Sequence, residues 1–147
     1  MMRALTLHRP WPWAIFHASP ERAKRVENRG WHPPAHVIGQ DLAIHAGLLF
    51  DRGGADFIHR LNPSDYPDDD AAHPTGVIGI VRVTGCRSQR FACGDSWWFG
   101  PHGWAFDRVR ALPAPIPCRG AQGLWVLPPE VERKVHDALG ARRSEVA

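Results

Sequence analysis

The amino-acid sequence predicts a single domain of the α+β class, mostly β with short helices, whose strands form a small β-barrel. The chain of 147 residues has the length of one ordinary domain. Hydrophobic residues make up 44% and charged residues 22%, which supplies a core and excludes a disordered or fibrous chain. Strand patterns occur in both halves of the chain, with short helices between them and no internal repeat or linker. That order fits a barrel with helices packed around it better than a doubly wound sheet.

Seven segments have the pattern of a strand, either alternating apolar and polar residues or an apolar β-branched run. In chain order they are residues 2–8, 26–31, 41–46, 75–85, 97–99, 104–112 and 123–127. Alternation in the third segment places Leu42 and Ile44 on one face and Ala43 and His45 on the other. The fourth segment is rich in valine, isoleucine and glycine, which predicts a central strand with a bulge or a close contact at its glycines.

Three helices are expected between and after these strands. They fall at residues 13–16, within residues 48–61 and at residues 129–139. Pro10 and Pro12 suit the first turn of the first helix. The glycine pair 53–54 should weaken or break the second helix, because glycine is a poor helix former. Gly140 is the expected cap of the third.

The distribution of charge favours a polyanionic partner. The formal net charge is +3, but Asp65, Asp68, Asp69 and Asp70 lie in one predicted surface loop, residues 64–74, and the rest of the chain carries +7. Of the 18 cationic side chains 16 are arginine, whose guanidinium binds phosphate in a bidentate manner and stacks on bases. Arginine codons in a GC-rich genome explain the same composition, so charge alone leaves a nucleic-acid partner open.

The cysteines and histidines carry no recognisable metal or disulfide motif. Cys86, Cys93 and Cys118 are odd in number and include no C-x-x-C pair, so we expect mostly buried thiols in a reducing compartment. The nine histidines lack metal-ligand spacing, and no metal or other cofactor is expected. The chain has no run of about 20 apolar residues and no signal peptide, which predicts a cytoplasmic protein without a membrane partner.

The strongest candidate site lies within residues 24–29, which read K-R-V-E-N-R. If a strand begins near Val26, Glu27 and Arg29 share one face by the two-residue period, and Lys24 in the preceding turn can point to the same side. A lysine beside a carboxylate and a guanidinium binds an anion or takes part in proton transfer, so Lys24, Glu27 and Arg29 are the candidate catalytic residues. The alternative is a solvated strand edge with surface ion pairs.

A second candidate feature is the aromatic segment 97–104, which holds Trp97, Trp98, Phe99 and Trp104. Adjacent Trp97 and Trp98 on a strand must face opposite sides. An exposed aromatic ring beside glycines is a stacking platform for an unpaired base, a contact worth about 1–3 kcal/mol. We expect core packing for three of the four rings and base stacking for one, with Trp97, Trp98 and Trp104 as the ligand-binding candidates.

Two further polar residues are ligand-binding candidates. Gln122 lies between Gly120 and Gly123, which would let backbone amides and the Gln122 side chain approach a ligand edge. A tight turn into the last strand explains the same glycines. His45 alternates away from Leu42 and Ile44, so it faces a cleft or is a hydrogen-bonded core histidine.

Together these segments resemble the ASCH family of the PUA-like superfamily, whose signature is approximately G-x-K-x-x-E-x-R after an amphipathic helix. Lys24, Glu27 and Arg29 fall on its three functional positions, whereas Arg22 stands in place of the glycine. The resemblance spans most of the chain, continuing through Trp31 and residues 44–46, 76–81, 100–101 and 120–125. It implies a PUA-like barrel with a cleft into which the lysine, glutamate and arginine project.

The resemblance also implies a function in binding RNA or a modified nucleoside. Some similar proteins are small amidohydrolases that remove an acyl group from N4-acetylcytidine with a Lys-x-x-Thr pair and a distant glutamate. This chain has Glu27 at the threonine position, and other similar proteins look like ribonucleases or RNA-binding modules. Binding of RNA or a nucleoside is therefore the leading prediction, a small hydrolase is the alternative, and a protein-interaction module without a ligand is a third.

Overall fold

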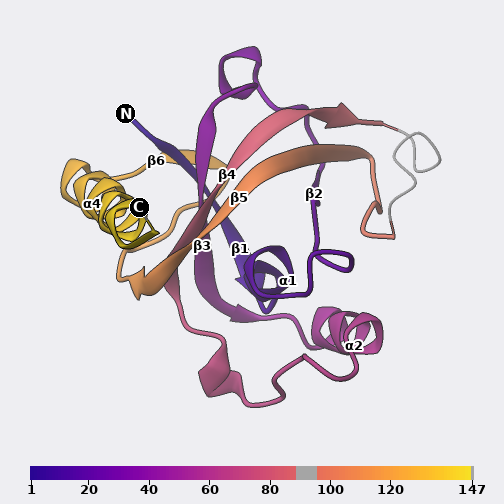
Figure 1. Ribbon diagram of the computed structural model, residues 1–147. Coiled ribbons are helices and arrows are strands. Elements are labelled where there is room, and N and C mark those ends of the chain that lie inside the picture. Colours follow the sequence, from indigo (N-terminus) through magenta and orange to yellow (C-terminus); the bar gives the residue numbers. More distant parts are fainter. Residues whose placement is uncertain (89–95, 147) are drawn as a thin grey trace.

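Six strands form one mixed sheet in the computed structural model, which describes residues 1–88 and 96–146 (Figure 1). They are β1 (Arg3–Arg9), β2 (Val26–Arg29), β3 (Asp41–Phe50), β4 (Gly76–Arg87), β5 (His102–Ile116) and β6 (Leu124–Val126). The order across the sheet is β2-β5-β4-β3-β1-β6. Neighbouring strands are antiparallel except β1 and β3, which are parallel.

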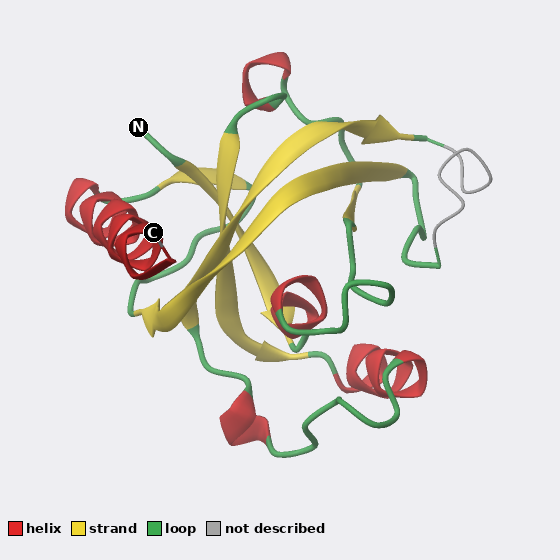
Figure 2. Ribbon diagram, viewed as in Figure 1, coloured by secondary structure: helices red, strands yellow, loops and turns green. Residues whose placement is uncertain are grey.

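The predicted α+β class is confirmed, but the hydrogen-bonded sheet is not closed into a barrel. Its two edges are β2 and β6, and these strands do not pair with each other in the part of the chain that the structure describes. They are also the shortest strands described, with four and three residues, whereas β4 and β5 have 12 and 15. The long central strands twist strongly across the molecule, with the helices around them (Figure 2).

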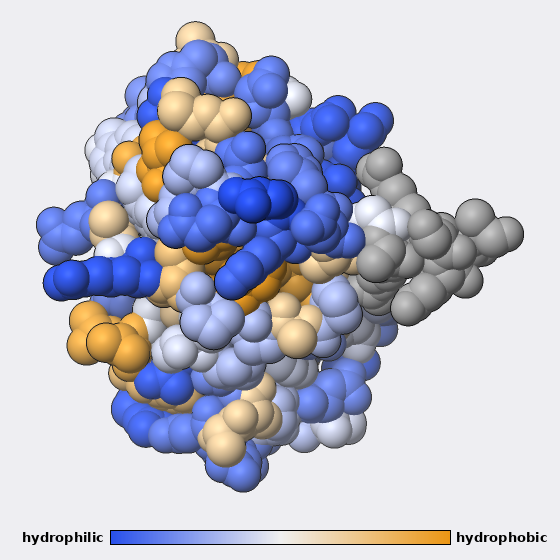
Figure 3. Space-filling model, turned by 90° about the vertical axis from the view of Figure 1, so that its left-hand side faces the viewer, coloured by the Kyte–Doolittle hydropathy of each residue, from blue (hydrophilic) through white to orange (hydrophobic). Residues whose placement is uncertain are grey.

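Three α-helices are described, α1 (Trp11–Phe16), α2 (Arg52–Leu61) and α4 (Pro129–Val146), with 3-10 turns η1 (Ala35–Val37) and η2 (Asp70–Ala72). None of the helices in the described residues is both long and apolar enough to cross a membrane. The side of the molecule that carries the N-terminus, β6 and α4 is mostly hydrophilic, and its apolar patches are separated by polar side chains (Figure 3).

Alternating side chains of the strands build a core on each face of the sheet. Leu5, Leu42 and Val81 pack on the face that α1 covers through Ile15. Their neighbours in sequence, Ala4, Ala43 and Ile80, pack on the opposite face, which α4 covers through Val131 and Val135. This arrangement confirms the two-residue alternation predicted for β1 and β3. The strand β4 was predicted from its apolar β-branched run, and its side chains alternate in the same way.

The sequence predicted that the glycine pair 53–54 would weaken or break the second helix, but α2 is continuous because it begins later than predicted. Residues 48–50 belong to β3, and Asp51 caps the helix by accepting a hydrogen bond at 2.9 Å from the Gly54 backbone N–H. Gly53 and Gly54 therefore lie in the first turn. A Cβ on Gly54 would come within 2.7 Å of the Trp11 ring, so the missing side chain makes room for that tryptophan.

Three other predictions depended on glycines or aromatics and had different outcomes. Gly140 does not end the last helix, because α4 continues to Val146; an interior glycine costs only about 1 kcal/mol. Residues 97–99 do not form the predicted strand, because Trp97 ends a turn and the two residues after it are irregular. The close contact predicted at the β4 glycines is confirmed at Gly79, where a Cβ would come within 2.4 Å of the Phe16 ring.

Candidate functional site

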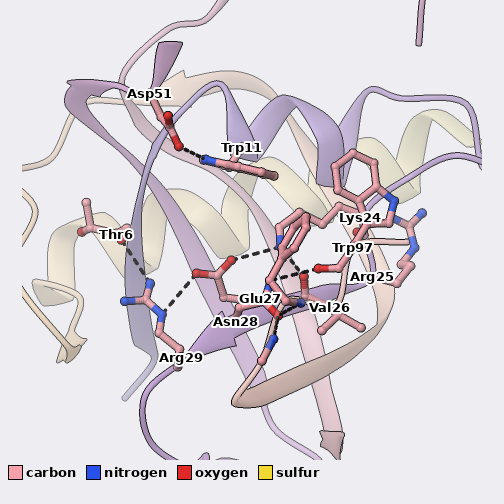
Figure 4. A network of polar contacts seen from close by, with 12 residues as sticks. Thr6, Trp11, Lys24, Arg25, Val26, Glu27, Asn28, Arg29, Asp51 and Trp97 are labelled. Carbon is pink, nitrogen blue, oxygen red and sulfur yellow. Dashed lines mark hydrogen bonds and ion pairs between the residues drawn. The ribbon is translucent and has the colours of Figure 1, made fainter. Parts of the chain in front are cut away.

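The side chains of Lys24, Glu27 and Arg29 form a chain of ion pairs (Figure 4). The Lys24 ammonium lies 3.2 Å from Glu27 Oε1, and Arg29 Nε lies 3.2 Å from Glu27 Oε2. The second pair lacks the alignment of a hydrogen bond, since Arg29 Nε has no hydrogen-bond partner among the described residues. The carboxylate is thus shared by two cations, and the sequence prediction that these three residues lie together is confirmed.

Lys24 is buried because the turn after α1 folds it under the sheet edge. Its backbone N–H donates to the Ala14 carbonyl at 2.8 Å, which ties the turn to the helix. The ammonium donates to the Val26 carbonyl and lies 5.4 Å from the centre of the Trp11 ring, a cation–π distance. Only 2% of the Lys24 side chain is exposed, compared with 12% of Glu27 and 21% of Arg29. The lysine is the innermost of the three charges.

A cleft of about 320 Å³ opens over these side chains. It is lined by Thr6, Leu7, His8, Trp11, Lys24, Glu27, Asn28, Arg29 and Phe99. The β1 backbone forms one wall, and Arg29 Nη2 donates to the Thr6 carbonyl at 3.3 Å across the floor. The cleft therefore joins β1, β2, α1 and the turn that precedes β5.

Asn28 fixes the aromatic side of the cleft. Its side-chain amide N–H donates to the Trp97 carbonyl at 2.9 Å. Its side-chain oxygen accepts from the backbone N–H groups of Phe99 and Gly100 at 2.8 and 3.1 Å. These three bonds hold the turn against β2 and leave the Phe99 ring 55% exposed at the cleft.

Phe99 is thus the ring of the aromatic segment that reaches the cleft. Trp97 and Trp104 are buried, at 4% and 0% exposure, and neither offers a free ring face to a base. Trp98 is half-buried against Gly100 and Gly103, and its indole N–H donates to the Arg87 carbonyl at 2.8 Å. The expected ratio of three packed rings to one exposed ring holds, but the three tryptophan candidates are the packed ones.

His45 lies on the opposite face of the sheet from the cleft. It is the cross-strand partner of Thr6, and both side chains point away from the face that holds Leu5 and Leu7. The Cys118 carbonyl, 2.7 Å from Nε2, can only accept, so Nε2 carries the proton. Nδ1 then accepts from the Thr6 hydroxyl at 3.2 Å, and His45 is a hydrogen-bonded core histidine.

The 120–123 turn packs against His45 and does not line the cleft. A Cβ on Gly120 would come within 2.7 Å of the His45 ring, so glycine is needed for this close approach. The Trp125 indole completes the network by donating to the Thr6 hydroxyl at 3.1 Å. Gln122 is exposed and does not line the cleft. These glycines are explained by the tight-turn alternative.

Besides Asn28 and Phe99, sequence reasoning also missed Trp11 and Asp51, which shape the cleft. The Trp11 indole N–H donates to Asp51 Oδ2 at 2.9 Å, and this bond orients the ring over Lys24. Trp11 belongs to the W-P-W stretch at the start of a predicted helix. In an amphipathic helix, a tryptophan at such a position is expected to pack in the core. Asp51 could have been found as an N-cap three residues before Gly54, had the helix start been placed correctly.

The described cysteines are not activated nucleophiles. Cys86 and Cys118 are half-buried free thiols, where mostly buried thiols had been predicted, because each lies near the end of a strand. Burial raises the pKa of both thiols, so the protonated form is favoured. Cys93 lies outside the described residues.

A search of protein-family models found no match to this chain, and a search of curated proteins found none with significant similarity.

Replacing Asp51 by alanine should lower the free energy of unfolding by about 1–3 kcal/mol, because the helix cap and the bond to Trp11 are both lost. The Gly54 backbone N–H, and then the Trp11 indole, hold the pKa of the Asp51 carboxyl below its ordinary value of 3.8. The stabilisation is therefore complete above pH 3.8 and is lost as the pH falls through the lowered pKa.

Urea unfolding of the wild type and of Asp51→Ala between pH 7 and pH 2 measures the difference in their free energies of unfolding. The matched control is Asp56→Ala, which removes an exposed carboxylate from the same helix and should change stability by less than about 0.5 kcal/mol. A difference between wild type and Asp51→Ala that persists undiminished at pH 2 would contradict the role of the ionised carboxylate.

Proposed function

We propose that this chain is a PUA-like domain of the ASCH type that binds RNA or a modified nucleoside in the cleft over Lys24. The observation that supports the proposal most directly is the shared carboxylate. Glu27 holds two cations at the floor of a cleft whose rim carries the exposed Phe99 ring. A flat, polar-edged ligand needs this combination of a stacking surface and fixed hydrogen-bonding groups.

The charge and size of the cleft agree with such a ligand. Lys24 and Arg29 contribute two positive charges against the single negative charge of Glu27, which leaves a net positive floor. No described residue accepts a hydrogen bond from Arg29 Nη1, so this group is available to a carbonyl or phosphate oxygen. The volume of about 320 Å³ is at the lower end of the range of small-molecule pockets, about 300–1,000 Å³.

Phe99→Ala should weaken binding of the ligand by about 1–3 kcal/mol, which is roughly a 5- to 150-fold rise in Kd, because the stacking surface is removed. The ring is more than half exposed, so the thermal midpoint should change little. Titration calorimetry measures the Kd of the wild type and of Phe99→Ala. Leu49→Ala, an exposed apolar residue that does not line the cleft, is the control and should bind normally. Unchanged binding in Phe99→Ala would remove the stacking role.

The alternative function is hydrolysis of an acylated base, and the contact between Lys24 and Glu27 is the observation that favours it. A buried ammonium 3.2 Å from a carboxylate can exchange a proton with a bound water. Thr6 is the sole hydroxyl residue among those that line the cleft, and its hydroxyl bonds His45 and Trp125 on the other face. The nucleophile would therefore be water, and the products would be the free base amine and a carboxylic acid. A ribonuclease is a lesser alternative.

Incubation with a panel of modified nucleosides and short single-stranded RNAs tests the proposal. Mass spectrometry follows products, and calorimetry follows binding. Saturable binding without conversion supports the binding function, and conversion supports the hydrolase. Binding of RNA that weakens steeply between 50 and 200 mM salt identifies phosphate contacts, whereas a free nucleoside shows a weaker dependence. Neither binding nor conversion would favour a protein-interaction module.

A further inference from the structure

Three side chains of types that can bind a metal ion come from separate segments and meet near the end of the sheet. His32 follows β2, Cys86 lies near the end of β4, and His102 begins β5. One ligand atom from each lies within 4.8 Å of the others. The two imidazole rings are 3.9 Å apart between their centres and tilted by 44°. No sequence motif indicated this cluster, since 54 positions separate His32 from Cys86 and 16 separate Cys86 from His102.

Strand pairing fixes two of the three ligands on the same face. Cys86 is the cross-strand partner of Trp104, and His102 lies two residues before Trp104 on the same strand. Directly opposed residues and residues two apart share a face, so Cys86 and His102 are diagonal neighbours. The sheet therefore holds a thiol and an imidazole in place before any ligand binds, and the exposed His32 completes the group from the loop.

A buried, unpartnered nitrogen also points to a ligand. The Nδ1 atom of His102 is buried and has no hydrogen-bond partner among the described residues. A buried polar atom without a partner costs about 1–3 kcal/mol. A cation bound at this nitrogen would provide the interaction that the described residues leave out.

We propose that His32, Cys86 and His102 bind a divalent transition metal ion, with zinc as the preferred ion. One thiolate and two imidazoles form a donor set that suits zinc and disfavours magnesium and calcium, which prefer oxygen. Zinc bonds nitrogen at about 2.0–2.1 Å and thiolate sulfur at about 2.3 Å, so the donor atoms must close slightly around the ion. The Cys86 thiol releases its proton to solvent when the metal binds. A fourth position remains for water or a ligand atom.

The proposed metal site lies beside the cleft, and the proposal does not depend on the function of the cleft. His102 is the cross-strand partner of Arg29, which lines the cleft. A bound ion would join the loop after β2 to β4 and β5, and so restrain the strand that carries Glu27 and Arg29. Failure of nucleoside binding would leave this proposal standing, and failure of metal binding would leave the cleft as described.

Titration of chelator-treated, untagged protein with Co²⁺ tests the site. The experiment uses the full chain in a Cys93→Ser background, so that Cys86 and Cys118 are the remaining thiols. Bound Co²⁺ should give the near-ultraviolet charge-transfer absorption of a cobalt–thiolate bond, and Zn²⁺ should abolish it by displacement. Cys86→Ser should lose this absorption. Cys118→Ser, which removes the other half-buried thiol, should keep it.

His32→Ala should weaken Co²⁺ binding at least ten-fold, and it should remain folded because the side chain is exposed. A cooperative thermal melt of every variant checks the fold, and Zn²⁺ should raise the midpoint of the parent protein but not of Cys86→Ser. Absence of the charge-transfer absorption in the parent, or its survival in Cys86→Ser, would overturn the assignment.

Discussion

Replacing Lys24 by methionine should lower the free energy of unfolding by about 3 kcal/mol and weaken ligand binding at least ten-fold. The ammonium is nearly fully buried and pairs with Glu27 at 3.2 Å, so its removal leaves a poorly compensated carboxylate under the sheet edge. Losses of 3–5 kcal/mol are usual for one partner of a buried pair, and the value here should be near the lower limit because Arg29 still contacts Glu27. Methionine keeps most of the aliphatic stem, so the change isolates the charge.

The experiment combines chemical unfolding with titration calorimetry. Lys134, the other lysine of the chain, is exposed on α4, and Lys134→Met should behave like the wild type in both measurements. In the double variant Lys24→Met/Glu27→Gln the buried charge is neutralised, so stability should recover in part while binding stays weak. Full binding by that double variant would show that the cleft does not use Lys24.

Replacing Trp104 by alanine should lower the free energy of unfolding by about 3–5 kcal/mol. The side chain is fully buried in the core, its indole N–H donates to the Trp31 carbonyl at 3.0 Å, and the two rings meet edge to face with their centres 4.9 Å apart. Deletion would remove the packed ring and leave that carbonyl without its donor.

Denaturant unfolding followed by circular dichroism measures the loss, and Trp31→Ala is the control. The Trp31 ring is 38% exposed, so its removal should cost clearly less than the loss of Trp104. The opposite result, a stable Trp104→Ala protein that no longer binds its ligand, would make Trp104 the stacking surface in place of Phe99.

Local sequence patterns predicted the elements that depend on neighbouring residues. Period-two alternation identified β3, an apolar β-branched run identified β4, and the same two-residue period placed Glu27 and Arg29 on one face of β2. The prediction was weaker wherever a boundary depended on a distant contact. The start of α2 was placed too early because the cap at Asp51 is strengthened by Trp11, 40 residues away in the sequence.

The aromatic residues 97–99 show the same limit of local sequence patterns. Nothing in the order Trp97, Trp98, Phe99 distinguishes a packed ring from an exposed one. Asn28, on another strand, bonds the backbone of this turn and so determines that Trp97 points into the core and Phe99 to the cleft. The exposure of these side chains therefore depends on the hydrogen bonds that a distant residue makes with their backbone.

The sequence by itself determined the α+β class, most strands and the grouping of Lys24, Glu27 and Arg29, because each depends on residues within one turn or strand. The tertiary structure alone decided that the sheet stays open, that His45 faces away from the cleft, and that His32, Cys86 and His102 meet. Strand register is the physical reason. The pairing of β5 with β2 and β4 sets which side chains become diagonal neighbours, and that pairing depends on packing across the whole core.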